Sequence, residues 1–346
     1  ILPHFKYKGI IMATVQLADI YNPVAFATGT QEDQIELNRF IQSGIITGDP
    51  RISAFAQGGG TKNEVAFMKP LGTPEPNYSS DDPSSNSTPQ KITGAKFDVR
   101  TAYQNQSWSV MDLASEVALV KPIPAITGKL GAYWATTNER RVIASSAGVL
   151  ADNVANDSGD MLNDISITTG TIADSNRINN NAIIDTIQTM GDHGEKIQAL
   201  AMHSAIYRKM QKDELLDTDI PASDAELNIR RYQGKMILVD DSLVPDTTVP
   251  AFPVYTVHLF TAGAYVGGEG MPQNASEMDR DPSAGNGGGE ELLYSRRTDI
   301  IHPLGFSCVG VPAGDSLTLA ELRLATTWDR VWARKVTGLA FLKVNL

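Results

Sequence analysis

The chain has 346 residues with a formal net charge of -11, 42% hydrophobic and 20% charged residues, which is ordinary for a globular protein of one large or two modest domains. The single cysteine, Cys308, excludes an internal disulfide framework and a multi-thiolate metal site. An acidic balance argues against tight duplex binding, which works by neutralising phosphates with Lys and Arg. It is also compatible with an acidic container wall that does not stick to enclosed DNA, and charge alone does not choose between the two. No apolar run is long enough for a membrane helix, so we expect no membrane partner.

Residues 12–57 mix short apolar patches with Asn, Pro, Gly and Thr, and the origin of residues 1–11 is unexplained. Only Gln31–Gln42 has helical spacing of its apolar residues. We therefore expect residues 1–57 to form an N-terminal arm that buries its apolar side chains against a neighbouring subunit.

Residues 58–107 contain two alternating runs around a polar insert. Asn63–Lys69 and Thr93–Gln104 alternate as strands do, and the stretch Gly72–Gln90 between them is rich in Pro, Ser, Asn and Asp. This pattern predicts an extended antiparallel hairpin loop with little core of its own. Because a two-stranded hairpin alone is marginal in water, we expect it to rest on another subunit.

Residues 108–155 predict a helix in two pieces. The first covers Ser109–Val120 and is broken by Pro122 and Pro124, because proline lacks an amide hydrogen and disfavours helix in the preceding residue. The second runs over Ala125–Ala147, with Gly148 as its C-terminal stop. At about 1.5 Å per residue it is a rod of roughly 30 Å or more.

Residues 156–346 alternate helical and strand patterns, so the fold class is α+β. Thr318 and Glu321 form a capping-box pair ahead of a predicted helix over Leu319–Trp332. We expect a mobile loop at Gly285–Gly289. The remaining predicted elements are helices at Asn181–Met190 and Ser204–Leu216, and strands at Ala199–Met202, Lys235–Asp240, Tyr255–Thr261, Asp299–Ser307 and Gly338–Val344.

Two glycine-rich stretches do not form nucleotide sites. Gly58-Gly59-Gly60-Thr61-Lys62 is followed by Asn63 and a strand, whereas a phosphate loop needs Ser or Thr after its lysine and a helix next. Gly267-Gly268-Glu269-Gly270 fails the dinucleotide fingerprint similarly. We expect no cofactor.

Catalytic groups are scattered. Asp192, His193 and Glu195 adjoin one another, but neighbouring turn positions rarely converge on one metal. His203 is interpreted as a packed or capping residue, and Asp240 with Asp241 as a solvated strand end. An α/β hydrolase-type enzyme using these three residues stays as an alternative. Cys308 is interpreted as a small apolar residue in a strand.

Several stretches, in order along residues 30–346, resemble the major capsid proteins of tailed bacteriophages with the Hong Kong ninety-seven type of fold. Early matches lie at the base of the hairpin and in the long helix, and later ones are stronger. They include Ala201-Met202-His203-Ser204, Tyr232-Gln233-Gly234-Lys235, Asp279-Arg280-Asp281-Pro282, His302-Pro303-Leu304-Gly305-Phe306 and Trp328-Asp329-Arg330-Val331.

The resemblance implies a shell subunit and not an enzyme. It implies a peripheral domain with a spine helix at 108–155, an axial domain with a mixed sheet at 156–311, and a return to the peripheral domain at 312–346. It also implies hexamers and pentamers closing into an icosahedral shell around double-stranded DNA, in a virion assembled in the host bacterial cytoplasm. A portal and a separate scaffolding protein are the further expected partners.

Three charged residues of the hairpin, Lys62, Glu64 and Lys69, are candidate contacts between subunits; a solvated face is the alternative. The other shell-forming alternative is an encapsulin-like nanocompartment, a relative with the same fold that encloses an enzyme cargo. The long polar hairpin tip favours the phage form.

Overall fold

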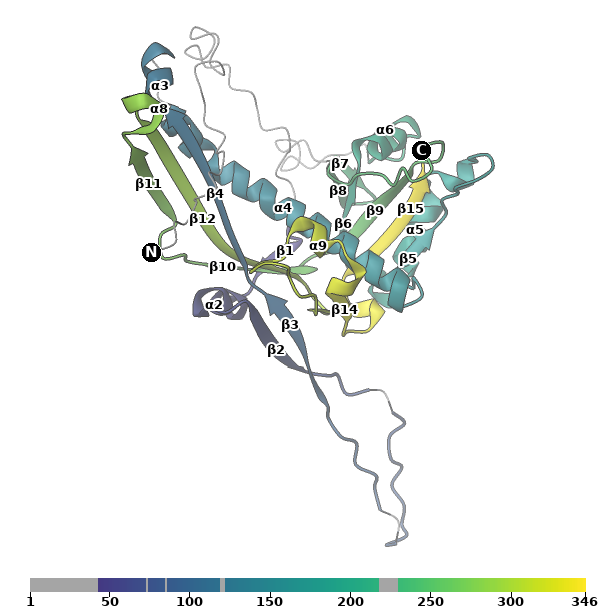
Figure 1. Ribbon diagram of the computed structural model, residues 1–346. Helices are drawn as coiled ribbons and strands as arrows, with labels where there is room; N and C mark the ends of the chain where they lie inside the picture. The colour runs from purple at the N-terminus through teal and green to yellow at the C-terminus, as the bar shows by residue number, and fades with distance from the viewer. Residues whose placement is uncertain (1–42, 73, 85, 119–121, 218–229) are drawn as a thin grey trace, which may run out of the picture.

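The computed structural model describes residues 43–346 except 73, 85, 119–121 and 218–229. Two β-sheets lie at opposite ends of one long helix, and a narrow two-stranded hairpin projects away from both (Figure 1). The predicted helix at Gln31–Gln42 lies outside the described residues.

The first sheet is five-stranded and carries the long strand β12 at its centre (Figure 1). β12 pairs with β10 and β11 along one edge and with β4 along the other, all antiparallel, while β1 adds parallel to β10. Its strands are β1 (Ile46–Gly48), β4 (Ala102–Met111), β10 (Tyr265–Gly270), β11 (Ser276–Asp281) and β12 (Glu290–Pro303).

The second sheet is six-stranded and mixed, in the order β5-β15-β9-β6-β8-β7. Its central strands are apolar on both faces, as strands covered on both sides must be. Its members are β5 (Leu162–Asp164), β6 (Ile197–Met202), β7 (Arg230–Tyr232), β8 (Lys235–Val239), β9 (Val254–Thr261) and β15 (Leu339–Asn345).

The helices pack around these sheets. The long helix α4 (Pro122–Asn156) runs from behind the first sheet to the second, and α5 (Asn180–Gln188) and α6 (Ser204–Lys212) lie beside the second (Figure 1). Shorter helices are α2 (Pro50–Gly58), α3 (Asp112–Ala118), α8 (Ala284–Gly287) and α9 (Leu319–Leu322), with 3-10 turns η2 (Asp174–Asn176), η3 (Gly191–Lys196), η4 (Ala325–Thr327) and η5 (Arg334–Val336).

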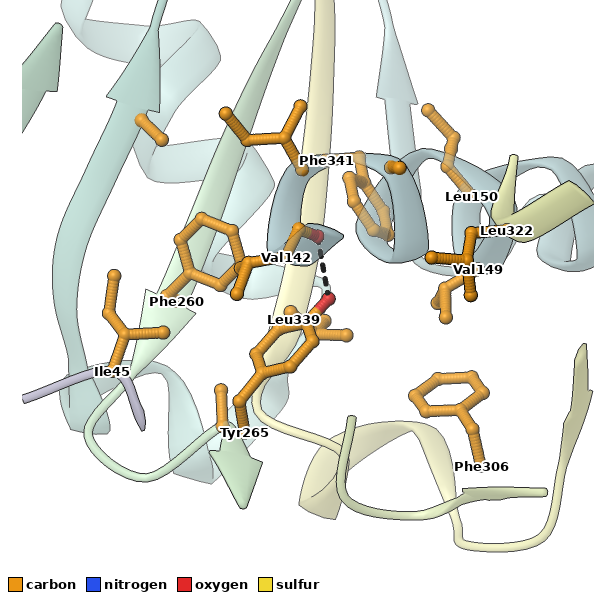
Figure 2. Close-up of a cluster of buried hydrophobic side chains, with 14 of the residues drawn as sticks. Ile45, Val142, Val149, Leu150, Phe260, Tyr265, Phe306, Leu322, Leu339 and Phe341 are labelled. Atoms are coloured by element: carbon orange, nitrogen blue, oxygen red, sulfur yellow. Dashed lines mark hydrogen bonds between the residues drawn. The ribbon is translucent and has the colours of Figure 1, made fainter. Parts of the chain in front are cut away.

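The main core lies where α4 meets both sheets. Val142, Val149 and Leu150 of α4 pack with Phe341 of β15 and with Phe306 of the short strand β13 (Phe306–Cys308) (Figure 2). Tyr265 of β10 donates to the carbonyl oxygen of Val142 at 3.3 Å and shares a 3.1 Å hydrogen bond with the Ser145 hydroxyl. The spine helix is thereby fixed to the sheets by apolar burial and buried hydrogen bonds together.

The structure corrects the predicted ends of the long helix. It begins at Pro122 and continues to Asn156 as one helix. Prolines are tolerated in the first turn because amides there have no intrahelical acceptor. Gly148 is not a stop but a packing position, since a Cβ there would lie 2.0 Å from the carbonyl oxygen of Leu322.

Other corrections concern shorter segments. The predicted first helix is strand up to Met111, and of its described residues Asp112–Ala118 are helical. The predicted helix Leu319–Trp332 is one helical turn, α9, followed by η4 and the strand β14 (Trp328–Arg330), which pairs with β13 (Phe306–Cys308). The capping box itself is present, because the Thr318 hydroxyl accepts from the Glu321 amide at 3.2 Å.

Residues 43–57, predicted as part of a coreless arm, pack on their own subunit. Asp49 caps α2 and Pro50 occupies its first turn. Ile52 and Ala56 are buried against β10, whose Gly268 and Gly270 leave no room for a Cβ under this helix. The domain boundaries remain a prediction, but the sheets cut across them: β12 pairs with β4, and β15 lies in the six-stranded sheet.

Candidate functional site: the hairpin and its base

The hairpin consists of β2 (Lys62–Met68) and β3 (Gly94–Arg100), paired antiparallel over seven residues each. β2 alternates exposed and half-buried side chains, as a strand with one packed face does. The predicted strands over Asn63–Lys69 and Thr93–Gln104 are therefore confirmed in kind, although the second one splits after Arg100 into β3 and β4.

Regular pairing ends well before the tip. Among the described residues of the hairpin, the last backbone hydrogen bond in line with the strands runs from the Lys69 amide to the Thr93 carbonyl at 2.9 Å. Farther out, the Asn77 side chain donates to the Thr88 carbonyl at 3.2 Å. Four apolar side chains in this projecting half are exposed, each by more than half: Met68, Leu71, Tyr78 and Ile92.

Two of the three candidate contact residues are paired within the hairpin. Lys62 forms a 2.9 Å ion pair with Asp98, and Glu64 forms a 2.8 Å ion pair with Lys96. The Glu64 carboxylate raises the pKa of Lys96 through a hydrogen bond and charge attraction. The Lys69 ammonium has no side-chain partner among the residues that the structure describes.

Aromatic rings hold the base of the hairpin, a feature that the sequence did not reveal. Phe97 of β3 stacks on His302 of β12 with ring centroids 5.4 Å apart and planes 6° apart. Phe67 of β2 contacts the ring of Trp332, which follows β14, at 5.9 Å in an edge-to-face arrangement. The strand alternation marks Phe67 and Phe97 as inward-facing, but no local signal names partners that lie so far along the chain.

The residues considered for catalysis have structural roles. The Nδ1 atom of His203 accepts from the Ala205 amide and the Asp241 carboxylate accepts from the Ser204 amide, so both cap α6. Asp240 accepts from the Ser242 amide in the turn after β8. These contacts confirm the capping interpretation.

Other candidate groups are also accounted for. Asp192 pairs with Lys335 at 2.7 Å. Cys308 is buried, and burial raises the pKa of its thiol to about 11, which disfavours the reactive thiolate and fits a small apolar residue in a strand. Among the described residues, no three His, Cys, Asp or Glu side chains are arranged to hold a metal ion. No described helix is long and apolar enough to span a membrane.

The comparisons with known proteins agree with this architecture. No family model matches the sequence. The major capsid protein of Bacillus phage SPP1 is 29% identical over 339 residues, which is 97% of this chain and 98% of that protein. The chain also superposes on the capsid of Ralstonia phage GP4 with a TM-score of 0.61 at 10% identity, covering 92% of this chain and 95% of that one.

Two further solved structures have the same fold. The capsid of cyanophage Pam1 gives a TM-score of 0.55 over 92% of this chain and 97% of that one, at 10% identity. A structure from Mycobacterium phage Che8 gives 0.52 over 97% and 98%, also at 10% identity. The chain therefore has the phage capsid fold of the Hong Kong ninety-seven type.

Similarity along nearly the whole of a phage major capsid protein, with this fold, identifies the chain as a structural capsid subunit of the virion that assembles with copies of itself. Like its relatives, it is a structural protein and not an enzyme. The same comparisons favour the phage capsid over the encapsulin-like alternative.

Proposed function

We propose that copies of this chain form hexamers and pentamers that close into an icosahedral shell around double-stranded DNA, and that the hairpin is the main contact between neighbouring copies. The observation that carries the proposal is the hairpin itself. It extends away from both sheets (Figure 1). It also exposes apolar side chains that its own subunit does not cover.

The energetics favour a neighbour as the partner of this segment. Covering apolar surface contributes about 25 cal/mol per Å² before the costs of association, whereas an exposed ion pair contributes roughly 0–1 kcal/mol. Leu71, Tyr78 and Ile92 would therefore supply most of the contact energy. Many such modest contacts allow a misplaced subunit to leave, while closure of the shell makes their sum difficult to reverse.

Lys69 is the leading charged contact of the three candidates, since its ammonium is unpaired among the described residues. Lys62 and Glu64 remain candidates through their exposed surface, but a neighbour would have to compete with Asp98 and Lys96 for them. The net charge of -11 fits a wall that encloses DNA without binding its sequence.

The remaining partners and the domain plan follow the same proposal. The proposed plan has five segments: the arm (1–57), the hairpin loop (58–107), the peripheral part with the spine helix (108–155), the axial part (156–311) and the closing part (312–346). A separate scaffolding protein guides assembly in the host bacterial cytoplasm, and a portal occupies one vertex. Expression of the chain with and without the other head proteins, followed by electron microscopy of the particles, tests the need for a scaffold.

Shortening the segment 72–90 to a tight turn tests the role of the hairpin. We expect the shortened chain to fold, because its core contacts lie elsewhere, but to lose closed shells. Circular dichroism measures folding, and sedimentation with negative-stain microscopy measures assembly. Normal shells from the shortened chain would contradict the proposal.

A further inference from the structure

The base of the hairpin is enclosed by rings from distant parts of the chain. We call Phe67, Phe97, His302, Trp328 and Trp332 the aromatic joint. Besides the two contacts already described, Phe67 lies 5.9 Å from Phe97, and His302 lies 5.8 Å from Trp328. The joint thus connects both hairpin strands to β12 and to the segment around β14.

The joint is buried and tightly packed on the body side. His302 is 2% exposed and its Nε2 atom is 2.8 Å from the Phe306 carbonyl oxygen, which fixes the plane of the imidazole that stacks on Phe97. The Trp332 ring lies against Gly305, where a Cβ would be only 3.0 Å from the tryptophan side chain. Gly305 has φ +88°, a backbone conformation that also favours glycine.

Polar contacts reinforce the same junction. The Asp98 amide donates to the Ser307 hydroxyl at 3.0 Å, which attaches β3 to β13. The Tyr103 hydroxyl donates to the Gly60 carbonyl at 2.9 Å, which attaches the start of β4 to the segment ahead of β2. Both strands of the hairpin are therefore held where they leave the body.

Beyond Met68 and Gly94 these constraints stop. Among the described residues, the outer half has few hydrogen bonds between its two strands and no contacts between aromatic rings. The hairpin is therefore restrained at its base and much less restrained in its outer half. In such an arrangement the packed rings fix the direction of the hairpin, and the outer half can adjust its conformation to a contacting surface.

We infer that the aromatic joint sets the angle at which the hairpin leaves the subunit, and that Trp332 and His302 are the positioning residues for its contact with a neighbouring copy. This inference rests on the proposed function of the hairpin. It adds that assembly depends on side chains that do not touch the neighbour at all.

Two variants of Trp332 separate positioning from general stability. Trp332→Ala removes the ring that covers Phe67, whereas Trp332→Phe keeps a ring there. The indole NH of Trp332 has no hydrogen-bond partner among the described residues, so Trp332→Phe abandons no hydrogen bond. Trp332 lies in a surface segment after β14, and thermal unfolding checks that both variants fold.

The angle of the hairpin can be measured directly on the unassembled full-length chain. Spin labels at Met68→Cys, at the end of β2, and Val154→Cys, on α4, occupy exposed positions, and buried Cys308 does not compete for the reagent. Electron paramagnetic resonance then gives the distribution of distances between the labels. We expect a narrow distribution for the parent chain and Trp332→Phe, and a broadened one for Trp332→Ala. Equal widths in all three would overturn the inference.

Assembly provides the second measurement. Closed shells should be lost in Trp332→Ala and retained in Trp332→Phe. If the chain shortened at 72–90 fails to assemble but Trp332→Ala assembles normally, the hairpin is a contact and the joint does not position it. If the shortened chain also assembles normally, the proposed role of the hairpin is itself wrong.

Discussion

Buried histidines make the subunit sensitive to acid at the residue scale. His258 of β9 is buried, and its Nδ1 atom is 2.9 Å from the hydroxyl of Ser146 on α4. Burial lowers the pKa of His258 to about 3 and that of His302 to about 4, against an ordinary value of 6.5. Both imidazoles are therefore neutral in the folded subunit at pH 7.

The sign of the pH effect follows from these depressed pKa values. An unfolded chain takes up the proton near pH 6.5 but the folded one only near pH 3, so stability is full above pH 6.5 and falls as the pH decreases toward 3. For His258 the loss amounts to up to about 5 kcal/mol.

Urea unfolding of the subunit between pH 7 and 4 should show this decline. His258→Gln should flatten the pH dependence. A His258→Gln curve parallel to that of the parent chain would contradict the assignment.

Gly148 is the second residue-scale test. A methyl group there would meet the Leu322 carbonyl oxygen at 2.0 Å and the Trp328 indole nitrogen at 2.6 Å, and these two atoms now share a 2.9 Å hydrogen bond. Gly148→Ala should therefore destabilise the subunit by about 1–3 kcal/mol or more through overpacking.

A matched control lies in the same helix. A methyl group on Gly131 of α4 would have no other atom within 4 Å, so Gly131→Ala should stabilise the helix by up to about 1 kcal/mol. Chemical denaturation measures both variants. Equal effects of the two substitutions would show that Gly148 is not a packing position.

At the element scale, the capping box of α9 is a prediction from the sequence that the structure bears out. Thr318→Ala should cost about 1 kcal/mol by leaving the Glu321 amide without its acceptor, and Thr318→Ser should cost much less. Thermal unfolding of the two variants is the measurement. If serine and alanine behave alike, the hydroxyl does not act as a cap.

Elements were predictable where their signal is local. The alternation of Val65, Phe67 and Phe97 identified the hairpin strands, because the period of a strand is visible in a few residues. Asp49 followed by Pro50 is a typical start of a helix, an N-cap residue and a first-turn proline, so this local signal was sufficient to predict α2. The capping box identified where α9 begins but contained nothing to say that it ends after one turn.

Elements were missed where distant contacts decide the outcome. Gly148 looks like a helix terminus, yet it continues the helix because Trp328 and Leu322 pack against it. The sequence also could not reveal the aromatic joint, since its rings come from segments that are adjacent only after both sheets have formed. Likewise, the partners of Lys62 and Glu64 depend on the register of β2 against β3.

At the scale of the whole molecule, the architecture itself accounts for the role of the chain as a capsid subunit, and no catalytic centre is required for that role. Its two sheets and spine helix bury several apolar clusters, whereas the outer half of the hairpin buries little within its own subunit. A subunit that is complete in its core and incomplete at its hairpin is suited to repeated association with copies of itself. The ordered resemblance along the chain was specific because it covered the whole architecture and not one motif.

The most direct test of this account is electron cryomicroscopy of assembled particles, with the chain traced through the hairpin. We predict closed icosahedral shells in which residues 62–100 cross onto a neighbouring copy, with Leu71, Tyr78 and Ile92 covered there and the rings of the aromatic joint packed as in the single subunit. Shells in which the hairpin contacts only its own subunit, or a chain that forms no closed particles even with the other head proteins, would contradict it.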